Sequence, residues 1–190
     1  DTIISQPIKG TAPRSDDPIM DEILKKSLLN DPKERAENIM ITDLVRNDLS
    51  KRALKGSVEV SELCQVYAYR QVHQMVSTIS CRVGQGVNPV DIIKDTFPMG
   101  SMTGAPKISA MKIIEELEET KRGLYSGAVG YFTPEGDFDF NVVIRSILYN
   151  HQKKYISYSV GSAITAKSNP EKEYQECLVK AKAMRSVLEG

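Results

Sequence analysis

The sequence predicts an α+β fold in which helices and antiparallel strands occupy separate stretches. Segment 57–83 is enriched in β-branched and aromatic residues, which is typical of strands. Runs 128–132 and 138–149 flank a Pro-Glu-Gly turn and predict a hairpin, with 155–160 as a third strand. Segment 34–48 has apolar residues at helical spacing, which indicates a helix ending near Arg52 with one buried stripe. The stripe consists of Ile39, Met40, Ile41, Leu44 and Val45.

The composition is that of an ordinary globular protein and argues against several classes of partner. Hydrophobic residues make up 41% of the 190 residues, and charged residues make up 26%. Because 25 basic residues balance 25 acidic ones, the charge favours neither nucleic acid nor an anionic membrane as a partner. No apolar run approaches the roughly 20 residues of a membrane span, and the N-terminus lacks a signal-peptide pattern.

The cysteines indicate a cytoplasmic protein with reduced thiols. Cys64, Cys81 and Cys177 are odd in number, widely spaced and without a Cys-x-x-Cys pair. This pattern favours neither a disulfide framework nor a zinc site. The chain has no starting Met and opens directly into a motif, so we expect a fragment of a longer protein.

A loop is expected at residues 5–14, where prolines and a glycine recur. Lys9 and Thr11 flank Gly10, so a ligand could approach the backbone there. The alternative is that Lys9 is an ordinary surface lysine.

Two further helices are expected on either side of the strand-rich segment. The first begins with Asp17 as N-cap and runs to about Asn30. The second covers 107–120 and follows a Gly-rich loop, 97–107, which could offer free N–H groups to an anion. This loop lacks the Gly-Lys-Ser/Thr of a Walker loop. The apolar stripes are Ile19, Ile23, Leu24 and Leu28 in the first helix, on its buried side, and Ile108, Met111, Ile114 and Leu117 in the second.

Two pairs of glutamates have the spacing of residues that share one helix face. Glu34 and Glu37 are three residues apart, as are Glu173 and Glu176 in the final predicted helix, 170–188, which Asn169 should cap. Two helices that each present such a pair could hold a hard divalent cation. Solvated surface glutamates are the alternative reading of the same spacing.

Other polar residues stand out from their surroundings. His73 lies in the strand-rich segment, where a buried structural role competes with a catalytic one. Arg145 interrupts an apolar run that reads as a buried strand, so it requires a counter-anion such as a ligand carboxylate. Gly161 and Ser162 end the last strand with small residues, where backbone could meet a ligand.

Together these motifs resemble the chorismate-binding family, which includes anthranilate, aminodeoxychorismate, isochorismate and salicylate synthases. The resemblance implies two large antiparallel sheets with outer helices around a central cleft, of which residues 1–190 would form the C-terminal part. The stretches that carry it are Pro7–Arg14, Glu34–Asp48, Phe97–Lys107, Gly123–Gly130, Asn141–Ser146, Val160–Thr165 and Glu171–Lys182.

The resemblance also implies roles for individual residues. Glu37 and Glu176 match the Mg²⁺ ligands of the family, and Glu34 and Glu173 match their water-mediated partners. His73 matches a histidine near the reacting ring carbons. The positions expected to bind the other groups of chorismate are Thr11, Tyr125, Arg145, Gly161, Ser162 and Lys180.

Position 9 separates the activities within the family. Anthranilate synthases usually have Pro-Ile-Ala-Gly-Thr here, whereas aminodeoxychorismate synthases have Pro-Ile-Lys-Gly-Thr, as this chain does at Pro7–Thr11. The resemblance therefore implies Mg²⁺-dependent amination of chorismate to 4-amino-4-deoxychorismate, for p-aminobenzoate and folate synthesis, with Lys9 as a nucleophile. Ammonia would come from a glutamine amidotransferase partner. The alternatives are an anthranilate synthase component and, for a fragment, a non-catalytic remnant that binds a partner subunit.

Overall fold

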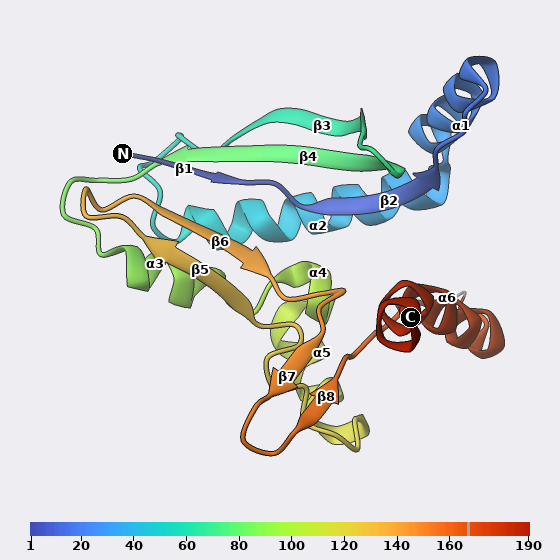
Figure 1. Cartoon of the computed structure of the whole chain (residues 1–190). Helices are drawn as coiled ribbons and strands as arrows, with labels where there is room; N and C mark the ends of the chain where they lie inside the picture. The colour runs from blue at the N-terminus through green and yellow to red at the C-terminus, as the bar shows by residue number, and fades with distance from the viewer. Residues whose placement is uncertain (167) are drawn as a thin grey trace. The chain divides into compact units, whose positions relative to one another are not determined.

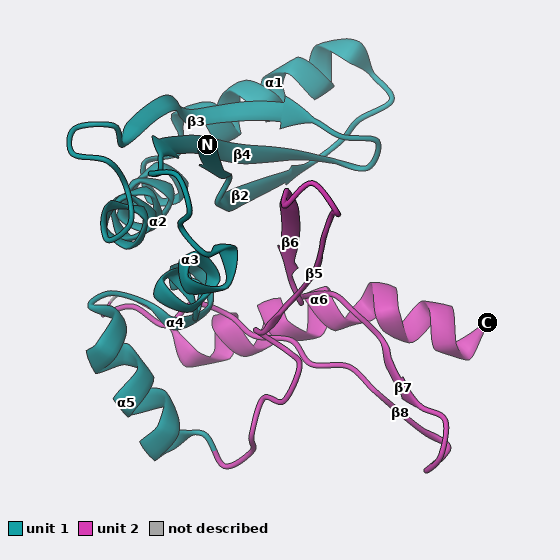
Figure 2. Cartoon of the chain, turned by 90° about the vertical axis from the view of Figure 1, so that its left-hand side faces the viewer, with its two compact units in different colours: residues 1–118 teal, residues 119–190 magenta. Residues whose placement is uncertain are grey.

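Strand β4 (Val72–Arg82) is the central strand of the first of two units into which the chain divides. In the computed structural model, which describes residues 1–166 and 168–190, unit 1 is Asp1–Glu118 and unit 2 is Glu119–Gly190 (Figure 2). In unit 1, β3 (Glu59–Ala68) pairs along one edge of β4. Strands β1 (Thr2–Ser5) and β2 (Ile8–Pro13) pair end to end along the other edge, and all pairs are antiparallel (Figure 1).

The predicted strands of segment 57–83 are confirmed, but the predicted loop at residues 5–14 is wrong. Most of that segment is strand β2, which pairs with β4 far along the chain. Pro7 falls between two strands and Pro13 ends β2, so neither proline interrupts the pairing. Gly10, with φ +101°, lies where the register of β2 shifts. The prolines and the glycine predict a loop, but pairing with a strand that is distant in the sequence decides the structure.

The helices of unit 1 begin where the sequence supplies a cap and a proline. Asp17, Asp31 and Asn88 each accept a backbone N–H of the first turn and precede a proline. They start α1 (Pro18–Asn30), α2 (Pro32–Ser50) and α3 (Pro89–Thr96), the last of which was not expected.

The Gly-rich loop contains a short helix, α4 (Gly100–Thr103), and precedes α5 (Lys107–Leu117), which ends before the predicted residue 120. Gly100 is buried, and a β-carbon added there would lie 2.8 Å from Leu44 Cδ1 of α2. This glycine permits close packing of α4 on α2. No helix among the described residues has the length and apolar character needed to cross a bilayer.

The core of unit 1 lies between β4 and the helices α1 and α2. Met75 and Ile79 of β4, Ile41 of α2 and Leu28 of α1 are all buried there. Burying a side chain of this size contributes about 1.5–3 kcal/mol.

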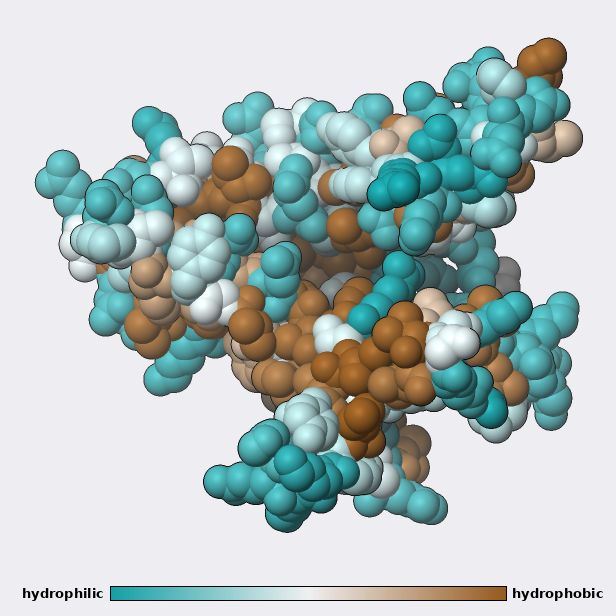
Figure 3. Space-filling model, viewed as in Figure 1, coloured by the Kyte–Doolittle hydropathy of each residue, from teal (hydrophilic) through white to brown (hydrophobic). Residues whose placement is uncertain are grey.

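Several apolar residues predicted to face a core are exposed instead. Ile19 and Ile23 of α1 are 73% and 53% exposed, and apolar side chains gather on the face seen in Figure 3. Spacing shows which residues share a helix face, but it does not show whether another element covers that face. The other exposed members of the predicted stripes are Ile39, Met40, Ile108, Met111 and Leu117.

Unit 2 contains two hairpins and a long helix. Strands β5 (Ala128–Phe132) and β6 (Phe138–Val142) form the predicted hairpin. β7 (Leu148–Asn150) and β8 (Tyr155–Ser157) form a second antiparallel pair, and Asn169 caps α6 (Pro170–Glu189) as predicted.

The predicted single strand 138–149 is wrong, because the chain leaves the strand conformation between β6 and β7. Arg145 lies in this break with φ +50°, and it is exposed rather than inside a buried strand. The strand predicted at 155–160 ends at Ser157. The three cysteines are free; Cys64 and Cys81 are buried and Cys177 is half-buried.

Candidate functional site

A β-bulge turns Lys9 toward helix α2. Ile8 pairs with Val76 and Thr11 pairs with Gln74, so β2 has one more residue than β4 between these pairs. The φ of +101° at Gly10 is in the left-handed region, which glycine adopts without steric cost. Thr11 therefore returns to the sheet face of Ile8, and the side chain of Lys9 meets α2 on the other face.

Lys9 forms an ion pair with Glu37, one of the two glutamates of the pair on α2. The Lys9 Nζ atom lies 3.6 Å from Glu37 Oε2, and both side chains are mostly buried. A β-carbon added at Gly10 would lie 3.3 Å from Glu34 Oε2, so the glycine leaves room for this carboxylate. Burial, and secondly the negative charge of Glu37, raises the pKa of Glu34. The prediction that Glu34 and Glu37 share a helix face is confirmed.

His73 and Thr11 lie on opposite faces of the sheet. Thr11 is opposite Gln74 in the register, whereas His73 is opposite Ala12, and neighbouring residues of a strand point to opposite faces. His73 is 1% exposed, and its Nε2 lies 2.8 Å from Asp21 Oδ1 of α1. The structure thus gives His73 a structural partner, and its catalytic role stays a prediction. Gln74, which sequence reasoning passed over, is the residue beside Thr11.

Unit 2 brings most of its predicted site residues together along the N-terminal half of α6. The Lys180 amine donates to the carbonyl of Gly161 at 3.0 Å and pairs with Glu176 at 2.6 Å. The Ser162 hydroxyl donates to Glu173. A β-carbon added at Gly161 would lie 2.7 Å from the Tyr125 hydroxyl oxygen, so only a glycine permits this approach. The cluster comprises Tyr125, Gly161, Ser162, Glu173, Glu176 and Lys180.

Arg145 is joined to this cluster by no hydrogen bond or ion pair among the described residues. Its guanidinium forms no hydrogen bond or ion pair with another residue in 1–166 or 168–190. Its predicted carboxylate partner is therefore not another described side chain, and a ligand carboxylate remains the prediction.

The chemistry of the predicted metal ligands fits a hard cation. Glu34 and Glu37 are adjacent carboxylates on one helix face. Burial, and secondly repulsion from Glu37, raises the pKa of Glu34, and a bound dication would favour its charged form. Glu173 and Glu176 are in unit 2, so the four predicted carboxylates are divided equally between the units. Among the described residues, no three or more His, Cys, Asp or Glu side chains gather closely enough to hold a metal.

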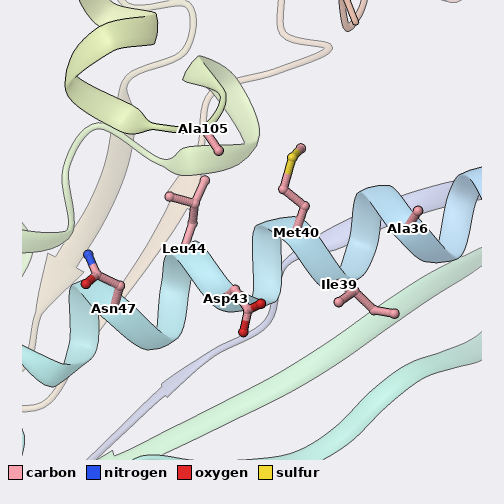
Figure 4. A pocket seen from close by; sticks show the side chains of 7 residues that line it. All are labelled: Ala36, Ile39, Met40, Asp43, Leu44, Asn47 and Ala105. Atoms are coloured by element: carbon pink, nitrogen blue, oxygen red, sulfur yellow. The ribbon is translucent and has the colours of Figure 1, made fainter. Parts of the chain in front are cut away.

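The apolar groove on α2 is separate from the predicted site residues. It has a volume of about 610 Å³, and Ile39, Met40 and Leu44 give it an apolar floor (Figure 4). Ala105 lies across it from Leu44, and none of its lining residues is a predicted site residue.

Comparison with known proteins identifies the relatives of this chain. It is 48% identical over 185 residues to a probable chloroplastic aminodeoxychorismate synthase of Oryza sativa subsp. japonica, covering 97% of the chain and 20% of that protein. It is 43% identical over 188 residues to aminodeoxychorismate synthase component 1 of Salmonella typhimurium strain LT2, covering 99% of the chain and 41% of that protein. The chain therefore spans less than half the length of these relatives.

A solved structure shows the same fold. Anthranilate synthase component I from Streptococcus pneumoniae TIGR4 matches with a TM-score of 0.83 and 36% identity, over 96% of this chain and 40% of that one. The family model for chorismate binding enzymes matches residues 1–186. The predicted fold class is confirmed, and the chain belongs to the family of chorismate binding enzymes.

Proposed function

We propose that the protein converts chorismate and ammonia to 4-amino-4-deoxychorismate, with Lys9 as the nucleophile. The observation that carries this proposal is the position of Lys9, which the β2 bulge turns toward Glu37 and Glu34. The relatives named aminodeoxychorismate synthases, at 43–48% identity, support it. A lysine offers a nucleophile at this place, where an alanine would offer none.

The proposed reaction has two displacements. In the first, Lys9 loses the proton of its ion-paired form, and the amine forms a bond to the chorismate ring while the bond to the 4-hydroxyl breaks. The departing hydroxide takes up that proton and leaves as water. In the second, ammonia forms the new C–N bond at the ring, and the bond to Lys9 breaks and returns the free amine. The balance is chorismate plus ammonia giving aminodeoxychorismate plus water. Glu37, which faces the amine at 3.6 Å, orients it for attack.

The remaining site residues would bind and orient chorismate. The Lys180 amine, the Tyr125 hydroxyl and the backbone at Gly161 converge in unit 2, which suits a carboxylate or an enolpyruvyl ether. Arg145 would pair with a substrate carboxylate, because its guanidinium has no counter-ion among the described residues. Thr11 would contribute its hydroxyl as a hydrogen-bonding group.

A bound Mg²⁺ would supply positive charge for a chorismate carboxylate. Glu37 and Glu176 would hold it directly, and Glu34 and Glu173 would do so through water, since magnesium retains several waters. The proposal includes a glutamine amidotransferase as the source of ammonia and a cytoplasmic location. A pull-down with the amidotransferase and cell fractionation test these two parts.

Product identity tests the proposed function. The protein at its natural full length, given chorismate, ammonia and Mg²⁺, should form a product that retains its enolpyruvyl group, measured by chromatography and mass. Lys9→Ala should slow this reaction by about 10²-fold or more, or redirect it to anthranilate, because the nucleophile is lost. Lys9→Arg should not restore it, since a guanidinium stays protonated.

Anthranilate synthase is the second candidate, since a structure of that name shares the fold at 36% identity. Release of pyruvate and anthranilate by the wild-type protein would favour this candidate and exclude the Lys9 mechanism. Lack of any turnover, with intact folding and bound chorismate, would favour a non-catalytic, partner-binding role.

A further inference from the structure

The side chain of Asn38 is the most fully buried polar group next to Lys9. Asn38 is 0% exposed and lies on the sheet-facing side of α2. Its Nδ2 donates to the carbonyl oxygens of Lys9 and Met75, each at 3.2 Å. Its Oδ1 accepts from the hydroxyl of Ser77. The Cys64 Sγ of β3 also lies 3.7 Å from this oxygen. One amide therefore connects α2 to β2, β3 and β4.

The chemistry of these neighbours fixes the orientation of the amide. Backbone carbonyls can only accept hydrogen bonds, so the NH₂ group must face Lys9 and Met75. The Ser77 hydroxyl accepts from the backbone N–H of Cys64 at 2.9 Å and so donates to Asn38 Oδ1. A flipped amide would set its oxygen against two carbonyl oxygens in a buried place, which is strongly unfavourable.

Two consecutive residues of α2 interact with Lys9, one with its side-chain amine and the other with its backbone carbonyl. Glu37 pairs with the amine at 3.6 Å, and Asn38 donates to the backbone carbonyl of the same lysine. Lys9 lies at the bulge, where the regular pairing of β2 with β4 is interrupted. Asn38 supplies a donor to this carbonyl from the helix that also carries the glutamates.

We propose that Asn38 is a positioning residue for Lys9, whose amide fixes the bulge of β2 so that the lysine amine faces Glu34 and Glu37. The proposal rests on the proposed function of Lys9 as the nucleophile. Asn38 acts through Lys9, because its hydrogen bond ends at the Lys9 backbone. A small displacement of a reacting group costs up to about 10²-fold in rate, which sets the expected size of the effect.

The first experiment compares Asn38→Leu with Thr42→Val in the protein at its natural full length. Asn38→Leu keeps the branched shape of the side chain, with larger end groups, and removes every hydrogen bond of the side chain. Thr42 is a matched control, since it is 2% exposed on the same helix. Within the described part of the chain, its Oγ1 donates only to the Asn38 backbone carbonyl, at 2.9 Å. We expect kcat to fall about 10²-fold in Asn38→Leu, with KM for chorismate changed less than about threefold. Thr42→Val should lose thermal stability but keep kcat.

A double-mutant cycle separates positioning from a general loss of structure. If Asn38 acts through Lys9, Asn38→Leu should not slow the residual turnover of Lys9→Ala any further. An equal factor in both backgrounds would overturn the proposal.

A labelling measurement tests the positioning separately from the reaction. Acetic anhydride modifies lysine amines, and peptide mass spectrometry gives the rate at Lys9 with the exposed Lys33 as internal reference. In Asn38→Leu, Lys9 should label about fivefold faster, because its amine leaves Glu37. If wild type forms anthranilate but this change appears, the proposed function fails and the positioning stands. An unchanged labelling rate in a folded variant would contradict the positioning.

Asn38→Ser is the second variant, since it carries no charge and keeps a hydroxyl donor. In Asn38→Ser, kcat should fall and Lys9 should be acetylated faster, both to a smaller degree than in Asn38→Leu. If neither Asn38 variant folds where Thr42→Val does, Asn38 is a residue of the fold alone and the proposal is wrong.

Discussion

At the scale of single residues, Asp21 organises the polar contacts around His73. Its carboxylate accepts from Arg14 Nε at 2.9 and 3.1 Å and from the backbone N–H of Ser15 at 3.0 Å. Because a carboxylate only accepts, His73 must carry its proton on Nε2 to donate to Asp21. In the described part of the chain, His73 Nδ1 is buried without a hydrogen-bond partner.

The contacts of Asp21 should make the folded protein less stable as the pH falls into the acid range. The Arg14 hydrogen bond, the Ser15 N–H and His73 hold the pKa of Asp21 well below its usual value of 3.8. A carboxyl with a lowered folded-state pKa stabilises the fold above its unfolded pKa and loses this as pH falls. Asp21→Asn should therefore lower Tm by several degrees at pH 7 and flatten the fall of Tm with pH below about 4.

Circular dichroism melts between pH 7 and pH 2 test this, with Asp43→Asn as control. Asp43 is an exposed carboxylate that pairs with Arg46 on α2, so its loss should change Tm little. An Asp21→Asn protein with the wild-type pH dependence would show that the contacts do not contribute.

The sequence predicts residue contacts that are close along the chain and fails for distant ones. Glu34 with Glu37 and Lys180 with Glu176 follow from helical spacing. The contact of His73 with Asp21 joins a strand to a helix, and no local pattern contains it. Likewise, the bulge that separates the faces of Lys9 and Thr11 depends on a pairing register that only the folded sheet defines.

At the scale of elements, helix α2 is held at its C-terminal end by a buried ion pair. Asp48 of α2 is 4% exposed and pairs with Lys107, the first residue of α5. Lys107 also donates to the carbonyl of Thr96 at the end of α3, at 3.0 Å. One lysine thus joins α2, α3 and α5.

Removing Lys107 should destabilise unit 1 strongly. Lys107→Met keeps the aliphatic stem but leaves Asp48 as a buried carboxylate with Lys51 as its remaining cation, 3.0 Å away. Breaking a buried pair in this way costs about 3–5 kcal/mol, of which Lys51 should recover part. Thermal unfolding measures the loss, and Lys51→Met, at an exposed lysine, should cost less than about 1 kcal/mol. Equal losses in the two variants would contradict a dominant role for Lys107.

Elements whose ends carry caps were predictable, whereas elements fixed by distant partners were not. Asp17 and Asn169 marked the starts of α1 and α6, because each cap is encoded within a few residues. Strand β2 was missed because its hydrogen-bonding partner is β4. The break between β6 and β7 could not be predicted, because the apolar run in the sequence continues through it. The positive φ of Arg145, which marks the break, is visible only in the structure.

At the scale of the whole molecule, the predicted metal ligands belong to two units. Glu34 and Glu37 are on α2 of unit 1, and Glu173 and Glu176 are on α6 of unit 2. Each pair already has a counter-charge or donor within its own unit, namely Lys9 for the first pair and Lys180 with Ser162 for the second. Under the proposed function, Mg²⁺ requires both pairs, so each unit alone would carry an incomplete ligand set.

This division predicts how substitutions in the two units combine. Glu37→Gln and Glu176→Gln should each lower Mg²⁺-dependent turnover at least about 10²-fold, because each removes a formal charge from the ligands of a dication. Residues that serve one ion act together, so the double variant should be no slower than the worse single variant. Glu34→Gln and Glu173→Gln should be milder, since these residues would act through water.

Turnover at a series of Mg²⁺ concentrations gives the measurement, and Mg²⁺-dependent Tm gives a readout that does not require activity. A ligand that binds only the folded state raises Tm by an amount that grows with the ratio of its concentration to its dissociation constant. Mg²⁺ should therefore stabilise wild type but neither single variant. Glu116→Gln, an exposed glutamate of α5 outside the site, is the control and should keep the full response. Losses that simply multiply in the double variant would mean that Glu37 and Glu176 serve separate functions, and the shared metal would have to be abandoned.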